Sequence, residues 1–185
     1  MARVPLIGED EPQLAGLIAH LKAQRGGRLI NLYRVLLNAP PLAQAWLAFN
    51  SAVRYSTTLP QAIVELAILR VSALNGAHYQ LRVHGPKHAL AAGLSVEQVD
   101  AIAGTAAGAP LPAALFDARQ RAVLACADAI TREIEPAAAV WAGFAEHFDA
   151  RQQVELTVLI SAYNMHTRVA RALQIDTEPP SPDRP

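Results

Sequence analysis

Apolar residues recur along this chain at the three- and four-residue spacing of amphipathic helices, and the strict alternation typical of strands is scarce. Alanine and leucine, which both favour helix, dominate the segments between the Gly, Pro and Asn breaks. The pattern predicts an all-α protein, a single-domain bundle of about seven to eight helices. The expected helices include 60–74, 77–92, 117–133 and a long last helix over 149–173.

The helix expected from Pro60 is unusual because nearly every face of it is apolar, which is typical of a buried helix. Glu65 lies in the middle of this helix and is therefore expected to be a buried or cleft carboxylate. Arg70 points about 140° away by helical geometry, so it is not an obvious local partner. A buried carboxylate must find a hydrogen-bond donor or have its pKa raised.

The next helix carries a polar stripe formed by Gln80, His84 and His88, with Pro86 expected to kink the helix just after His84. If the two helices pack antiparallel across Asn75-Gly76, Glu65 and His84 lie at nearly the same height. A carboxylate in contact with an imidazole orients the ring and fixes its tautomer. His84 is thus a candidate general acid–base group.

Two other interpretations of these residues stay open at this point. A Glu–His pair inside a helical bundle can serve only to satisfy two buried polar groups. The spacing of His84 and His88, with Glu65, is also compatible with zinc, but Pro86 falls between the two histidines and distorts their shared face. We expect no metal and no cofactor.

Composition narrows the classes of protein that remain. The formal net charge is zero, so no field favours nucleic acid or an anionic membrane, and no apolar run is long enough for a membrane span. The one cysteine, Cys126, cannot form an internal disulfide or support dithiol chemistry, and is best explained as a small core residue. Without a visible signal peptide, the expectation is a cytoplasmic protein.

Four stretches of the chain resemble the carboxymuconolactone decarboxylase and alkylhydroperoxidase-D-like family. They are Leu32-Tyr-Arg-Val-Leu-Leu-Asn-Ala-Pro-Pro-Leu-Ala, Glu65-Leu-Ala-Ile-Leu-Arg-Val, Tyr79-x-x-x-x-His84 with the later Ala-Gly-Leu-Ser, and Tyr163-Asn-Met-x-x-Arg168. The family motif has a Glu, a Cys-x-x-Cys pair and a His. Here Glu65 and His84 are present at the family spacing, whereas Ala77 and Gln80 occupy the cysteine positions. The acid–base half of the motif is kept and the redox half is absent.

The resemblance covers about 25–176 and implies a fold of the alkylhydroperoxidase-D-like type. We expect one helical domain over 1–176, followed by a Pro-rich disordered tail over 177–185. It also implies a homo-oligomer, typically a trimer or hexamer. Thiol peroxidase activity is not expected, because neither Ala77 nor Gln80 can form a thiolate.

The decarboxylase branch of this family needs neither a thiol nor a cofactor. Loss of carbon dioxide from its unsaturated lactone acid leaves a dienolate that must be stabilised and protonated. The resemblance implies that His84 transfers the proton and that Glu65 orients the ring. The candidate substrate-binding side chains are polar groups of the second motif helix, the last helix and an early short helix: Tyr79, Gln80, His88, Arg168, Tyr163 and Arg34. Arg168 or Arg34 could hold a substrate carboxylate, although Arg168 could instead form a salt bridge to an acid elsewhere.

The leading hypothesis is a cofactor-independent lyase acting on a small carboxylated lactone or enolisable acid, with His84 and Glu65 as the catalytic pair. Its partners would be a small-molecule carboxylate and copies of the chain itself, not nucleic acid or membrane. Two alternatives are a non-catalytic binding or assembly protein on the same scaffold, and a degenerate peroxidase-like partner that has lost its thiols.

Overall fold

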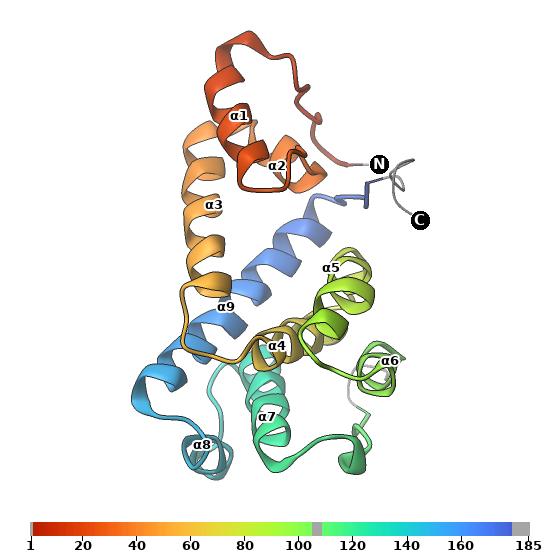
Figure 1. Ribbon diagram of the computed structural model, residues 1–185, viewed down its shortest axis with the longest axis vertical. Coiled ribbons are helices and arrows are strands. Elements are labelled where there is room, and N and C mark those ends of the chain that lie inside the picture. The colour runs from red at the N-terminus through yellow and green to blue at the C-terminus, as the bar shows by residue number, and fades with distance from the viewer. Residues whose placement is uncertain (1, 105–108, 179–185) are drawn as a thin grey trace. The chain divides into compact units, whose positions relative to one another are not determined.

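The computed structural model describes residues 2–104 and 109–178, without the side chain of Pro86. Within these residues the fold is all-α and contains no strand, as the sequence predicted (Figure 1). The helices are α1 (Ala15–Ala23), α2 (Asn31–Leu36), α3 (Pro40–Tyr55), α4 (Gln61–Leu74), α5 (His78–Val83), α6 (Val96–Gly104), α7 (Ala118–Glu133), α8 (Ala138–Ala145) and α9 (Ala150–Ala172). Two short 3₁₀ turns, Pro12–Leu14 and Ala113–Leu115, and a π-helical segment, His84–Ala89, complete the described elements.

The chain divides into two compact units, residues 1–51 with 170–185 and residues 52–169, so the boundaries fall inside α3 and α9. The single domain over 1–176 stays a prediction. Of the tail predicted to be disordered, residues 179–185 lie outside the described residues, whereas Glu178 is described and accepts a 2.6 Å hydrogen bond from the Asn31 backbone N–H.

The first unit is held together by a small apolar core and by its own C-terminal segment. Ile18, Leu21, Tyr33, Leu37 and Leu47 belong to the core, and each is almost completely buried. The Asn31 side chain donates to the carbonyl of Asp176, and the Arg3 backbone N–H donates to the carbonyl of Leu173. These contacts join the two ends of the chain within one unit.

The second unit is built around α4, in which every residue from 63 to 72 is buried. This confirms that a helix apolar on all faces lies in the core. Each fully buried Leu, Ile or Val side chain contributes about 1.5–3 kcal/mol, so the Ile63–Val71 stretch is a large share of the hydrophobic stabilisation. Arg70 is bonded to Asp128 on α7 and not to Glu65, in agreement with the helical geometry.

Side-chain caps fix the starts of three helices. Asp117 and Gln120 form a reciprocal capping box at α7, and Ser95 and Gln98 do the same before α6. Asp149 accepts a hydrogen bond from the Gln152 N–H at the start of α9. The predicted starts of α7 and α9 are therefore confirmed to within about one residue.

The second motif helix differs from the sequence expectation in one respect that affects the site. A single kinked helix was expected over 77–92, but α5 ends at Val83 and the chain continues as a π-helical segment from His84 to Ala89. Pro86 has no N–H and cannot bond to the Arg82 carbonyl, which accounts for the loss of α-helical hydrogen bonding here. Wider turns of this kind occur frequently at functional sites.

The connection between this segment and α6 is close. A Cβ atom added at Gly85 would lie 3.3 Å from Cγ1 of Val99 on α6, so the glycine permits the approach.

None of the described helices combines the length and the apolar character that crossing a membrane requires.

Candidate active site

Glu65 and His84 lie in direct contact inside the second unit. Nδ1 of His84, at the first residue of the π-helical segment, is 2.7 Å from Oε2 of Glu65 on α4. Glu65 is 2% exposed and His84 is 5% exposed, so the contact is shielded from water. The two helical segments thus bring together the pair that the sequence singled out.

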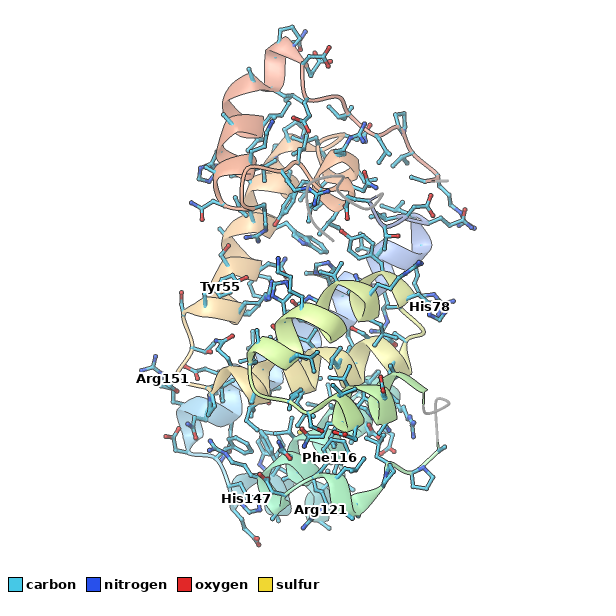
Figure 2. All side chains as sticks on the ribbon, turned by 45° about the vertical axis from the view of Figure 1, so that its right-hand side comes forward. Tyr55, His78, Phe116, Arg121, His147 and Arg151 are labelled. Carbon is cyan, nitrogen blue, oxygen red and sulfur yellow. The ribbon has the colours of Figure 1, made fainter. Side chains whose placement is uncertain are left out.

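Arg54 completes the arrangement, and the sequence analysis did not identify it. It lies beside Tyr55 in the last turn of α3 (Figure 2), and its Nη2 donates to Oε1 of Glu65 at 3.1 Å. One oxygen of the carboxylate therefore faces the guanidinium and the other faces the imidazole. The expected burial of Glu65 predicts that some hydrogen-bond donor contacts its carboxylate. The spacing of residues near Glu65 does not indicate that this donor is Arg54.

Burial is the largest influence on the pKa of each member of the pair. Burial raises the pKa of Glu65. The contacts with His84 and Arg54 lower that pKa by more than burial raises it, so it lies below its usual value. Burial lowers the pKa of His84 by more than Glu65 raises it, and Arg54 lowers it further. Near neutral pH we therefore assign a neutral ring, which leaves Arg54 as the cation that keeps Glu65 ionised.

The protonation states fix the tautomer of His84. An ionised carboxylate can only accept a hydrogen bond, so the proton in the 2.7 Å contact belongs to Nδ1. The other ring nitrogen, Nε2, has no hydrogen-bond partner among the described residues and carries the lone pair. This is the arrangement of a general base.

Aromatic rings surround His84. The His88 ring centroid lies 5.3 Å away, and Tyr163 on α9 meets His84 edge-on at 5.6 Å. Tyr163 also stacks on His166 at 5.4 Å. His88 is half-buried, and burial together with the charge of its neighbours lowers its pKa. Two of the predicted substrate-binding residues, His88 and Tyr163, are thus gathered around the ring.

Gln80 lies one helical turn before His84, and the His84 backbone N–H donates to the Gln80 carbonyl. The side chain is almost completely buried, at 1% exposure, and neither atom of its amide has a hydrogen-bond partner among the described residues. Tyr79, the adjacent predicted residue, is half-buried. Ala77, at the other position where the family has a cysteine, is buried.

The two arginines proposed to hold a substrate carboxylate are engaged elsewhere. Arg168 is exposed, and its Nη1 donates to Oδ1 of Asn164 on the same helix at 2.6 Å. Arg34 belongs to the first unit, where its Nε donates to the Ile7 carbonyl at 3.0 Å. Neither hydrogen bond tests whether these side chains contact a substrate, and that role stays a prediction.

Cys126 is a buried residue of α7, and burial raises the pKa of its thiol to about 11. It is therefore a weak source of thiolate near neutral pH. Across residues 2–104 and 109–178, no group of three or more His, Cys, Asp or Glu side chains is placed to hold a metal ion.

The fold is all-α, and it brings Glu65 from the middle of α4 into contact with His84, the residue that follows α5. Residues 40–129 match the model of the carboxymuconolactone decarboxylase family, the family that the motif residues resemble. No curated protein matches the chain in sequence.

Solved structures share the fold at low sequence identity. An uncharacterized peroxidase-related protein from Silicibacter sp. TM1040 has a TM-score of 0.78 and 20% identity, and the alignment covers 96% of this chain and 92% of that chain. The debrominase Bmp8 in complex with 2,3,4-tribromopyrrole has a TM-score of 0.73 and 18% identity, with 96% and 94% covered. A putative antioxidant defence protein AhpD of unknown function from Agrobacterium tumefaciens has a TM-score of 0.68 and 24% identity, with 78% and 96% covered. At these identities the likeness supports the fold alone.

Proposed function

We propose that this protein is a cofactor-independent enzyme that acts by general acid–base catalysis on a small carboxylated lactone or a related enolisable acid. The observation that carries the proposal is the 2.7 Å contact between His84 Nδ1 and Glu65 Oε2, with the second carboxylate oxygen held by Arg54. A buried carboxylate fixed on both sides can hold the imidazole in one orientation and one tautomer.

In the proposed reaction, Nε2 of His84 handles the proton. As a base, it takes a proton from the carbon next to a carbonyl, and the electrons of the C–H bond move into the enolate. In a decarboxylation, Nε2 first takes the proton of the substrate carboxylic acid, the C–C bond electrons form the dienolate as carbon dioxide leaves, and the ring then returns that proton to carbon. Glu65 stabilises the imidazolium in both directions.

The family and its neighbours support an enzyme but differ in the reaction they suggest. The matched family is named for a decarboxylase, which favours a lyase, whereas one structural neighbour is a debrominase. A thiol-based reaction is disfavoured for this chain because its one cysteine is buried and has a raised pKa. Proton transfer at carbon needs only the groups that surround His84.

The proposal is tested with His84→Gln, which keeps a polar side chain but cannot act as a base near neutral pH. Exchange of the acidic C–H of a γ-lactone carboxylate in D₂O, followed by NMR, measures proton transfer directly. We expect the variant to lose about 10²- to 10⁴-fold in exchange rate, the usual contribution of a general base.

The matched control is His147→Gln, at an exposed histidine between α8 and α9 (Figure 2), which should leave the rate unchanged. Circular dichroism shows whether each variant keeps its fold. Wild-type exchange that survives in a folded His84→Gln protein would mean that the buried pair is structural, and the protein would then be a binding or assembly protein on this scaffold.

A further inference from the structure

Gln80 is a buried amide of the second unit, and the described residues offer a hydrogen-bond partner to neither of its two polar atoms. Its amide nitrogen and its amide oxygen are both buried and unpaired among the described residues. We propose that Gln80 is a substrate-contacting residue, whose amide N–H donates to the carbonyl oxygen that becomes the enolate oxygen. This inference rests on the proposed acid–base function.

Several other buried polar side chains of the same unit are hydrogen-bonded, although the hydroxyls of Thr57 and Thr157 also lack a partner among the described residues. The Asn164 amide nitrogen donates to Thr131 and to the Ile160 carbonyl, and the Thr167 hydroxyl donates to the Tyr163 carbonyl. The Ser72 hydroxyl donates to the Ile68 carbonyl. Buried polar groups in proteins are normally satisfied in this way, so an amide left wholly unpaired calls for an explanation.

The position of Gln80 supplies that explanation. Because the His84 N–H bonds to the Gln80 carbonyl, the two residues are one α-helical turn apart and their side chains project from the same face. The face carries the imidazole that exchanges the proton, with Tyr163 across from it. A substrate carbon within reach of His84 Nε2 would place its adjoining carbonyl oxygen toward the Gln80 amide.

The amide suits the reaction because it is neutral and fixed. When the substrate proton moves to His84, the C–H electrons pass to the carbonyl, and negative charge develops on that oxygen. A donor already held in place stabilises this charge more in the transition state than in the ground state. The proton itself stays with His84, so Gln80 gains and loses no bond other than a hydrogen bond.

The inference predicts opposite effects on stability and on rate for Gln80→Leu, which keeps the size of the side chain and removes both unpaired atoms. Without substrate, Tm should rise by about 2–4 °C, because the cost of burying an unpaired amide is removed. The exchange rate of the γ-lactone carboxylate should fall by about 10- to 1000-fold, with the loss in kcat rather than in KM.

Gln98→Leu provides the matched control. The Gln98 amide nitrogen donates to the Leu115 carbonyl and to Gln120, and its amide oxygen accepts from the Ser95 N–H, so its loss should lower Tm and leave the exchange rate unchanged. A lower Tm for Gln80→Leu would show a structural role and overturn the inference. An unchanged exchange rate would overturn it too.

The two proposals fail in different ways. If wild-type protein gives no exchange, or if His84→Gln exchanges as fast as wild type, the acid–base function is wrong and the role of Gln80 falls with it. If His84→Gln loses exchange while Gln80→Leu keeps it, the acid–base function stands and only the role of Gln80 is wrong.

Discussion

At the scale of single residues, Arg54 is one of the groups that set the charge of the Glu65–His84 pair, after burial and the contact within the pair itself. Its side chain is 14% exposed, and its Nη2 lies 3.1 Å from Glu65. A guanidinium stays protonated at all relevant pH values, so it acts together with the His84 hydrogen bond to keep the carboxylate ionised. At the same time its charge opposes a second positive charge on His84. Arg54 is thus a positioning residue that favours a neutral ring.

The assignment of a neutral His84 ring predicts how the rate of substrate C–H exchange in D₂O depends on pH. Because the pKa of His84 lies below 6.5, the ring stays a base at neutral pH, and activity should fall only as the pH drops below that value. Arg54→Met removes a positive charge that lowers the pKa, so the acidic limb of the rate profile should move to higher pH. Arg54→Lys keeps the charge and should stay near the wild-type profile.

The same pKa shift links folding stability to pH. The unfolded chain binds a proton on His84 more readily than the folded protein does, so stability should decrease as the pH falls from 6.5 through the lower folded pKa. The lowered pKa of Glu65 acts in the same direction below its usual value of 4.5. For the exchange-rate profile described above, an acidic limb at the same pH in wild type and in Arg54→Met would contradict the charge assignment.

The candidate site was predictable only where its residues lie near each other in the sequence. Glu65 and His84 sit on adjacent helical segments at nearly equal distances from the Asn75-Gly76 turn, so helical geometry alone placed them together. Arg54 and Tyr163 come from α3 and α9, and their approach depends on how those helices pack. Periodicity within one helix carries no information about that packing.

At the scale of elements, the wide turn at His84 is the feature that links the local sequence to the site. The α-helical hydrogen bonds end where Pro86 cannot donate, and His84 lies at the boundary between the two kinds of helix. Gly85 next to it allows α6 to approach closely. Helix propensity predicted a helix here, whereas the form of the interruption depends on contacts with α4 and α6.

The end of α7 stores backbone strain that can be relieved. Ile134 follows the last residue of this helix with φ 70° and ψ −51°, a conformation close to the rare classic γ-turn. It is 86% exposed, so its side chain gains little from packing. Ile134→Gly should stabilise the protein by about 1 kcal/mol, since strained conformations of non-glycine residues cost about that much or more.

Thermal unfolding measures this effect, and a gain of 1 kcal/mol corresponds to a rise in Tm of about 2–4 °C for a chain of this size. Glu135→Gly is the matched control, because a glycine at a position of ordinary φ only adds freedom to the unfolded chain and should not raise Tm. Equal or lower Tm in Ile134→Gly would show that the strain is absent in solution.

At the scale of the whole molecule, the helices were predicted better than their grouping. The fold class and the starts of α7 and α9 follow from apolar spacing and capping residues, both of which are local signals. The division into two compact units was not expected, since the sequence has no linker rich in Gly, Pro or Ser near residue 51 or residue 170. Both boundaries run through continuous helices, where a composition change cannot mark them.

The assembly of the chain gives the last prediction. The family resemblance implies a trimer or hexamer, and α9 exposes the apolar side chains of Val154, Val158 and Met165 at helical spacings of four and seven. A formal net charge of zero reduces repulsion between copies. Light scattering at micromolar concentration should therefore give three or six times the chain mass of 19.8 kDa.

A charged residue tests whether this face of α9 is the contact. Val158→Glu would place a carboxylate in the middle of the apolar stripe, where desolvation without a partner is costly, and should shift the mass toward a single chain. Val96→Glu, at an exposed position on α6, is the matched control and should keep the oligomer. A wild-type mass near 19.8 kDa would contradict the assembly, whereas an intact oligomer of Val158→Glu would place the contact on another surface.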